Sequence, residues 1–259
     1  MKEIWLPNLY ELTNLLAFRC CPICHRRLLK SENCVCVSCL NRLTRLTHKP
    51  SNFHPIFEQT FYWQRTFVAA TCQYYFTDNM RILVHQFKYY HDGRMAVWLG
   101  CQAALELLHT GFFDGIQYLI PVPLHWKRQM LRSYNQSEKI ARGIQRITKI
   151  PIQTGILKRC KNNPTQTHLR REERVENVRG IFGLTKNKDT LRSKHILLID
   201  DVLTTGATLN ECLEVLSQIE GIKISIFALC YASDTPILHY NENRDFPHVF
   251  IMNGPPEQH

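Results

Sequence analysis

Residues 196–208 read ILLIDDVLTTGAT, and this stretch decides how the rest of the chain is interpreted. It joins an apolar segment to two adjacent acids, and the acids to a loop of hydroxyl side chains around one glycine. The apolar part has no polar alternation, which is typical of a strand that is covered on both faces. The residues after the loop follow a helical pattern. We therefore predict a strand, a loop and a helix in that order.

Segments on both sides of this stretch alternate between strand and helix patterns. From residue 61 to residue 232, β-branched and apolar runs alternate with segments whose apolar residues recur at helical spacing. This alternation is typical of an α/β fold with a mainly parallel sheet flanked by helices. The expected strands are 67–76, 116–123, 195–200 and 222–232, and the expected helices are 8–18, 78–90, 95–109, 135–149 and 206–220.

The length of 259 residues leaves room for one sizeable domain and a small one. We expect a cysteine-rich module with a linker in residues 1–60, the α/β domain in residues 61–235 and an extended tail in residues 236–259. No run approaches the roughly 18 apolar residues of a membrane span, and the N-terminal segment lacks a continuous apolar signal-peptide core. A cytoplasmic protein without membrane insertion is therefore expected.

The two acids and the loop after them offer complementary binding groups. Ligands of open α/β sheets bind beyond the carboxyl ends of the strands, where Asp200 and Asp201 are expected. The backbone N–H groups at the start of the next helix favour a phosphate, and Gly206 lets the backbone approach it closely. Carboxylates accept hydrogen bonds from vicinal ribose hydroxyls, and Mg²⁺ is expected nearby. A ribose phosphate matches both the acids and the loop. Its phosphate is expected on Thr204, Thr205, Gly206, Ala207 and Thr208.

This stretch resembles the binding motif of type I phosphoribosyltransferases, in which four hydrophobic residues and two acids are followed by Thr-Thr-Gly-x-Thr. In that family the acids hold the ribose hydroxyls of phosphoribosyl pyrophosphate, and the loop holds its 5′-phosphate. The resemblance implies those roles for Asp200, Asp201 and residues 204–208. An acidic helix cap on an unrelated α/β fold is the alternative interpretation of the same residues.

The positive charge of the chain is concentrated in one segment. Residues 127–194 hold 18 Lys and Arg against 5 Asp and Glu, whereas the net charge of the whole chain is +10. Such a segment indicates an anionic partner, although a solvated charged face gives the same pattern. Arg128 and Arg132 are candidates for the pyrophosphate, because guanidinium groups match phosphate oxygens. The candidates for single-stranded DNA are Lys127, Arg128, Arg132, Lys161, Arg170 and Arg171, with Trp126, Tyr134 and Phe182 for base stacking.

Six of the eleven cysteines lie within residues 20–39. Two Cys-x2-Cys pairs are separated by 11 residues, a spacing that supplies four thiolates for a closed, structural zinc site. A short segment with little apolar content needs such a metal to fold. Cys20 or Cys34 could replace a neighbouring ligand, and a redox dithiol is the other interpretation. The expected zinc ligands are Cys21, Cys24, Cys36 and Cys39.

Taken together, these segments resemble the competence protein F family (ComF, ComFC and GntX-like) of phosphoribosyltransferase-like proteins. In place of the Arg-Gly-Phe-Asn-Gln that is frequent in this family, the chain has RSYNQ, so that Ser133 stands at the glycine position. The tail after residue 233 has no counterpart in the resemblance. The segments that carry it are CPIC (21–24), HQFKYYHD (85–92), PVPLHWKRQMLRSYNQS (121–137), TQTHLRREERVENVRGIF (165–182) and the loop at 196–208.

The resemblance implies a role in natural transformation, in which incoming single-stranded DNA is handled in the cytoplasm. It also implies binding of phosphoribosyl pyrophosphate with Mg²⁺, and it makes a competence helicase or translocase a candidate partner. Two classes stay open: an enzyme that transfers phosphoribosyl to an unknown acceptor, and a competence factor that binds without turnover. A metabolic phosphoribosyltransferase of nucleobase salvage, without a DNA role, is the alternative. The sequence names no catalytic residue.

Overall fold

The computed structural model describes residues 19–46, 61, 66–90, 92–124, 130, 133–160, 180–232 and 250–251. These residues fall into two compact units, Met1–Leu43 and Thr44–His259. The expected helix at 8–18 lies outside the described residues, as do the part of the linker after residue 46 and nearly all of the tail. Within the described part, no helix combines the length and the apolar character that crossing a membrane requires.

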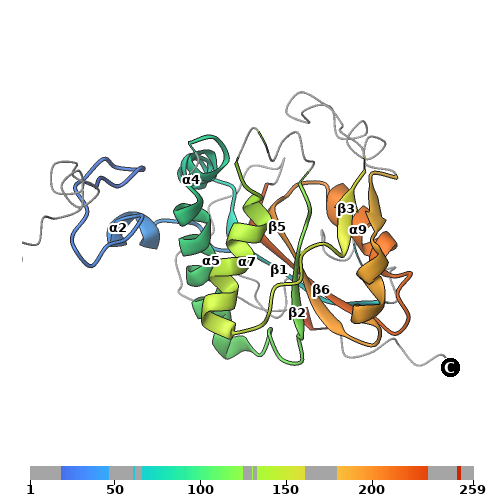
Figure 1. Cartoon of the computed structure of the whole chain (residues 1–259). Helices are drawn as coiled ribbons and strands as arrows, with labels where there is room; N and C mark the ends of the chain where they lie inside the picture. The colour runs from blue at the N-terminus through green and yellow to red at the C-terminus, as the bar shows by residue number, and fades with distance from the viewer. Residues whose placement is uncertain are drawn as a thin grey trace, which may run out of the picture. The chain divides into compact units, whose positions relative to one another are not determined.

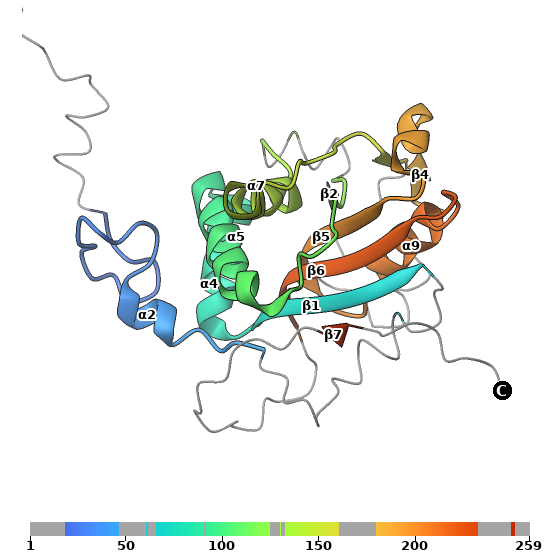
Figure 2. The same ribbon diagram turned by 90° about the horizontal axis from the view of Figure 1, so that it is seen from below.

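The second unit is built on a five-stranded sheet with the order β2-β5-β6-β1-β7 (Figures 1 and 2). The pairs β2–β5, β5–β6 and β1–β6 are parallel, and β7 adds to β1 in the antiparallel direction. The expected α/β fold with a mainly parallel sheet is therefore confirmed. The strands are β1 (Phe67–Tyr75), β2 (Tyr118–Pro121), β5 (His195–Leu203), β6 (Lys223–Tyr231) and β7 (Phe250–Ile251).

Helices cover both faces of this sheet. Figure 1 shows α5 and α7 on one side of the sheet and α9 on the other. Because strand side chains alternate between the faces, Ile196 and Leu198 of β5 join the core under α9, and Leu197 and Ile199 point to the opposite face, where they are also buried. The helices of this unit are α4 (Asp78–Tyr89), α5 (Gly93–Leu107), α7 (Gln136–Thr148) and α9 (Ala207–Leu216).

Smaller elements complete the two units. A two-stranded antiparallel sheet pairs β3 (Leu157–Arg159) with β4 (Phe182–Leu184). Two short 3-10 helices, η1 (Leu108–Thr110) and η3 (Lys186–Leu191), follow α5 and β4. The first unit contains one short helix, α2 (Val37–Asn41), among its described residues 19–43.

Two glycines allow α5 and α7 to pack against each other at close range. A Cβ atom at Gly143 would lie 2.1 Å from the carbonyl oxygen of Val97, and a Cβ atom at Gly100 would lie 2.3 Å from that of Ile140. Neither distance is compatible with a side chain, since the blocking atoms belong to the backbone of the facing helix. The packing of α7 therefore depends on both glycines, and α7 carries residues of the candidate site.

Gly143→Ala is expected to lower the free energy of unfolding by about 1–3 kcal/mol, because the added methyl group forces the two helices apart. Urea unfolding of the variant and the wild-type protein measures this difference. Gly93→Ala is the control, since its Cβ would meet only side-chain atoms, those of the flexible Lys139 at 3.2 Å and of Tyr134 at 3.5 Å. Equal unfolding midpoints for Gly143→Ala and the wild type would contradict the close packing of α5 on α7.

Candidate functional site

The two adjacent acids lie at the carboxyl end of β5, within the strand. Asp200 pairs with Ala228 of β6, and the pairing continues to Leu203 opposite Tyr231. The expected strand end at residue 200 is therefore too early, because β6 is long enough to pair with the residues beyond the acids. Asp200 and Asp201 point to opposite faces of the sheet, as successive residues of a strand do.

Asp201 forms an ion pair with a lysine of α4. The Nζ atom of Lys88 lies 2.7 Å from Oδ2 of Asp201, and the two side chains are only 18% and 15% exposed. Lys88 is the last residue but one of α4, so the ion pair links the end of this helix to the end of β5. The charge of Asp201 is thus balanced by the ammonium group of Lys88.

Asp200 is held by α7 and by the backbone. Its Oδ1 atom accepts hydrogen bonds from Oγ of Ser137 at 3.1 Å and from the backbone N–H of Asp201 at 2.9 Å. Burial and the neighbouring charge of Asp201 raise the pKa of Asp200 to about 7, and these hydrogen bonds together with Lys88 offset only part of the shift. The two acids are therefore not equivalent, since Asp200 retains its proton up to a much higher pH than an ordinary aspartic acid.

This raised pKa makes stability depend on pH. An aspartic acid titrates near pH 3.9 in an unfolded chain, so between about pH 4 and pH 7 the folded protein binds a proton that the unfolded chain has lost. The resulting stability is present at low pH and is lost as the pH rises through the folded pKa. We expect the wild type to gain stability relative to Asp200→Asn on acidification, by at most about 1.4 kcal/mol per pH unit.

Urea unfolding of both proteins at about pH 5 and about pH 8 measures this change. A difference in stability that is the same at both pH values would show that Asp200 titrates as an ordinary acid.

The loop after the acids leads directly into α9. Gly206 has a φ of 78° and precedes the first helical residue, Ala207. The side-chain oxygen of Thr205 accepts a hydrogen bond from the backbone N–H of Ala207 at 3.4 Å. The N–H groups of the first helical turn have no acceptor within the helix, so this end of α9 favours an anion. The left-handed φ explains why glycine stands at position 206.

The segment before α7 is fixed to β2 and α4. Asn135 caps α7 by accepting from the N–H of Ser137, and its Nδ2 atom donates to the carbonyl oxygen of Val122 at 2.9 Å. The hydroxyl group of Tyr134 donates to the carbonyl oxygen of Phe87 in α4. Ser133 has a φ of 63°, a conformation that favours glycine, and this gives a physical reason for the glycine that is frequent at this position in the family. These contacts place Ser137 beside Asp200.

The structure brings together only part of the set expected from the sequence. Asp200, Asp201 and the loop at 204–208 lie together at the end of β5 and the start of α9. Phe182 is 6% exposed under the guanidinium group of Arg159, so it is not available for stacking on a base, and that expectation was wrong. The remaining candidates, Lys127, Arg128, Arg132, Lys161, Arg170, Arg171 and Trp126, lie outside the described residues.

Lys88 and Ser137 were not among the residues expected at the site. Both belong to segments that carry the family resemblance, HQFKYYHD and the RSYNQS region, but neither segment is near Asp200 in the sequence. A lysine on the edge of an amphipathic helix normally indicates a solvated surface. Its limited exposure beside Asp201 is what distinguishes it, and that property appears only in the folded chain.

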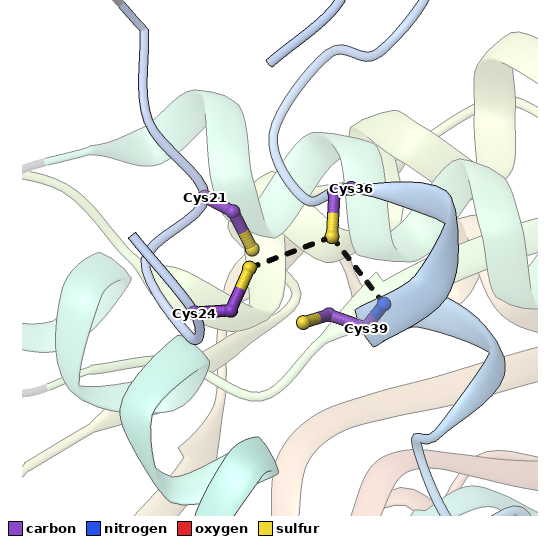
Figure 3. Close-up of side chains that lie close together, drawn as sticks. All are labelled: Cys21, Cys24, Cys36 and Cys39. Carbon is purple, nitrogen blue, oxygen red and sulfur yellow. Dashed lines mark hydrogen bonds between the residues drawn. The ribbon is translucent and has the colours of Figure 1, made fainter. Parts of the chain in front are cut away.

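The four cysteines expected to bind zinc are gathered in the first unit (Figure 3). Their sulfur atoms all lie within 4.8 Å of one another, and those of Cys24 and Cys36 are 3.7 Å apart. Tetrahedral coordination with Zn–S bonds of about 2.3 Å places sulfur atoms about 3.8 Å apart. The donor set thus fits a closed zinc site made by Cys21, Cys24, Cys36 and Cys39. Cys20 and Cys34 are not part of this group.

Hydrogen bonds around the group favour a thiolate at Cys36. Burial opposes ionisation, but the backbone N–H of Cys39 and the side chains of Cys39, Arg26 and Cys24 outweigh it and lower the pKa of Cys36 to about 6. The backbone nitrogen of Cys39 lies 3.4 Å from the sulfur of Cys36. A thiolate is the form that binds a metal, so these contacts agree with the donor set.

A buried glutamate connects the two cysteine pairs. Glu32 is 5% exposed and accepts hydrogen bonds from the backbone N–H groups of Leu29 at 2.8 Å and Val37 at 2.9 Å. These bonds lower the pKa of Glu32, and the guanidinium group of Arg26 lies 2.6 Å from the same carboxylate. Glu32 therefore fixes the start of α2, and with it Cys39, relative to the turn that carries Cys21 and Cys24.

Comparison with known protein families places a phosphoribosyl transferase domain at residues 134–251. This range includes α7, both acids and the loop that leads into α9. Among solved structures, the purine phosphoribosyltransferase from Pyrococcus horikoshii Ot3 aligns with 60% of this chain and 96% of its own, with 14% identity and a TM-score of 0.31.

Three curated relatives are similar over larger parts of the chain. Competence protein F of Haemophilus influenzae is 26% identical over 232 residues, which is 85% of this chain and 99% of that protein. The DNA utilization protein YhgH of Escherichia coli O157:H7 is 27% identical over 171 residues, or 65% of this chain and 72% of that protein. Competence protein ComFC of Bacillus subtilis is 27% identical over 219 residues, or 78% of this chain and 86% of that protein.

Proposed function

Because the chain belongs to the competence protein F family of phosphoribosyltransferase-like proteins, we propose that it acts in natural transformation and binds phosphoribosyl pyrophosphate at Asp200 and Asp201. One observation carries the binding proposal: the two carboxyl groups lie at the end of β5, and the chain continues from there directly into the N-terminus of α9. A sugar phosphate carries its hydroxyl donors and its phosphate only a few bonds apart. The carboxyl groups can accept from the hydroxyls, and the N-terminus of α9 can bind the phosphate.

The parts of the ligand have separate contacts. The ribose hydroxyls donate to the carboxyl groups of Asp200 and Asp201, and the 5′-phosphate accepts from the backbone N–H groups and hydroxyls of residues 204–208. Arg128 and Arg132 are the proposed contacts of the pyrophosphate. Mg²⁺ would be held by the oxygens of the pyrophosphate, as it commonly is with phosphate-bearing substrates. Zinc in the first unit has a structural role.

The DNA part of the proposal rests on the basic segment. Incoming single-stranded DNA is proposed to bind in the cytoplasm along Lys127, Arg128, Arg132, Lys161, Arg170 and Arg171. Fluorescence anisotropy of labelled oligo-dT measures this binding. Affinity should fall by at least about tenfold between about 50 mM and 200 mM salt, because contacts with phosphates release counterions. An affinity that does not depend on salt, or no binding, would exclude DNA contacts of this kind.

Turnover distinguishes an enzyme from a binding protein. Transfer would break the bond between C1 of the ribose and the pyrophosphate oxygen and form a bond from C1 to an acceptor, which gives up its proton. Pyrophosphate release that requires single-stranded DNA or another added acceptor would identify an enzyme of the competence pathway. Release with a purine or pyrimidine base alone would identify the alternative, a transferase of nucleobase salvage. Binding without release would identify a competence factor, for which a helicase or translocase is a candidate partner.

A further inference from the structure

The pairing of Lys88 with Asp201 has a consequence for ligand selection. The carboxylate that the sugar needs is occupied by the ammonium group of Lys88 at 2.7 Å, and both side chains are mostly covered by protein. Separating such a pair is costly, because it leaves a poorly solvated charge without a partner. A ligand that offers only hydroxyl groups to Asp201 does not repay this cost.

The second acid does not provide a substitute for Asp201. The carboxyl group of Asp200 already accepts from Ser137 and from the N–H of Asp201. Burial and the charge of Asp201 raise its pKa to about 7, so near neutral pH much of it is protonated. Asp201 is therefore the stronger acceptor of the two, and access to it depends on Lys88.

The backbone around Lys88 is held in place by hydrogen bonds, so the side chain of Lys88 is the part of the site that can change position. The carbonyl oxygen of Phe87 accepts the hydroxyl group of Tyr134, and the ring of Tyr134 lies beneath the ammonium group of Lys139 at 5.4 Å. These contacts tie the end of α4 to the start of α7. The four-carbon stem of Lys88 can still turn without moving either helix.

We infer that Lys88 is a specificity-determining residue that selects sugar phosphates with a second anionic group at C1, such as a diphosphate, over ribose 5-phosphate. This inference rests on the proposed function. C1 is bonded to the carbon that carries the 2-hydroxyl, so an anion on C1 lies close to the carboxylate that holds this hydroxyl. Lys88 then turns from Asp201 to the anion, Asp201 becomes free for the ribose, and neither charge is left without a partner.

The test compares two ligands on three variants. Calorimetry with Mg²⁺ measures the affinity of the zinc-loaded protein for phosphoribosyl pyrophosphate and for ribose 5-phosphate. Lys88→Met is expected to weaken the binding of phosphoribosyl pyrophosphate by about 10- to 100-fold, the value of a hydrogen bond to a charged group. The binding of ribose 5-phosphate should be unchanged or tighter. Lys88→Arg should restore most of the preference. Lys223→Met, at an exposed position at the start of β6, is the matched control and should equal the wild type.

With a folded Lys88→Met variant, two results would overturn the inference. Equal weakening of both ligands by Lys88→Met would assign a structural role to the lysine, and no change in either would remove it from the site. If Lys88→Met does not fold, Lys88→Gln, which keeps a donor for Asp201, replaces it with the same expected loss of preference. A wild-type protein that binds neither sugar overturns the proposed function and this inference with it, whereas tight binding of the diphosphate with an unchanged preference in Lys88→Met overturns only the inference.

Discussion

The double variant Asp200→Asn with Asp201→Asn is expected to lose phosphoribosyl pyrophosphate binding by more than about 100-fold while it retains the fold. Each hydrogen bond to a carboxylate contributes about 1.5–3 kcal/mol, and an amide has no charge and only one acceptor oxygen for the ribose hydroxyls. The fold is retained because the amide oxygens introduced at positions 200 and 201 can still accept from Ser137 and from the ammonium group of Lys88. In addition, Asp200 is buried with a raised pKa, and such a group loses little when it becomes neutral.

Ligand-induced thermal stabilisation measures this loss. The wild type should unfold at a higher temperature with saturating ligand and Mg²⁺, since a ligand that binds only the folded state stabilises it. The double variant should show no shift. Asp78→Asn with Asp189→Asn removes two exposed acids, whose side chains are 92% and 63% exposed, and should behave as the wild type. An undiminished shift in the Asp200 and Asp201 double variant would contradict the assignment of the ribose to these acids.

The second large effect is expected from the cysteines. The wild-type protein should contain about one zinc per chain, and Cys21→Ser with Cys36→Ser should contain none. Without the metal, residues 19–43 should lose their structure, because binding to a structural zinc supplies about 10–16 kcal/mol and this unit has few apolar residues to replace it. Metal analysis and hydrogen exchange of residues 19–43 measure the two effects.

A matched pair of cysteines provides the control. Cys20→Ser with Cys34→Ser should keep the zinc and the protection, since neither residue belongs to the group of four sulfurs. Loss of the zinc in this control would show that one of the two residues replaces a member of the group. A wild-type protein that is free of metal, with residues 19–43 still protected, would contradict the zinc site.

The fold could be predicted because its signals are local. The apolar run that ends in Asp200 and Asp201, and the loop around Gly206, lie within 13 consecutive residues, 196–208. Strand, loop and helix follow one another there as the pattern requires. The two Cys-x2-Cys pairs are just as local, and the four sulfur atoms meet as the spacing predicts.

The partners of the acids could not be predicted, because they come from distant parts of the chain. Lys88 reaches Asp201 only after α4 has packed near the end of β5, and Ser137 reaches Asp200 only through α7. The position of α7 depends in turn on Gly100 and Gly143, whose role appears only when the facing backbone is in place. The extension of β5 to Leu203 likewise depends on pairing with β6, which no local pattern specifies.

Calorimetric titration of phosphoribosyl pyrophosphate into the zinc-loaded wild-type protein, with Mg²⁺ present, tests the central claim most directly. The predicted result is saturable binding of one ligand per chain, with no heat from the Asp200→Asn and Asp201→Asn double variant under the same conditions. The absence of saturable heat from a wild-type protein that is folded and carries its zinc would contradict the claim that the end of β5 and the start of α9 form a phosphoribosyl site.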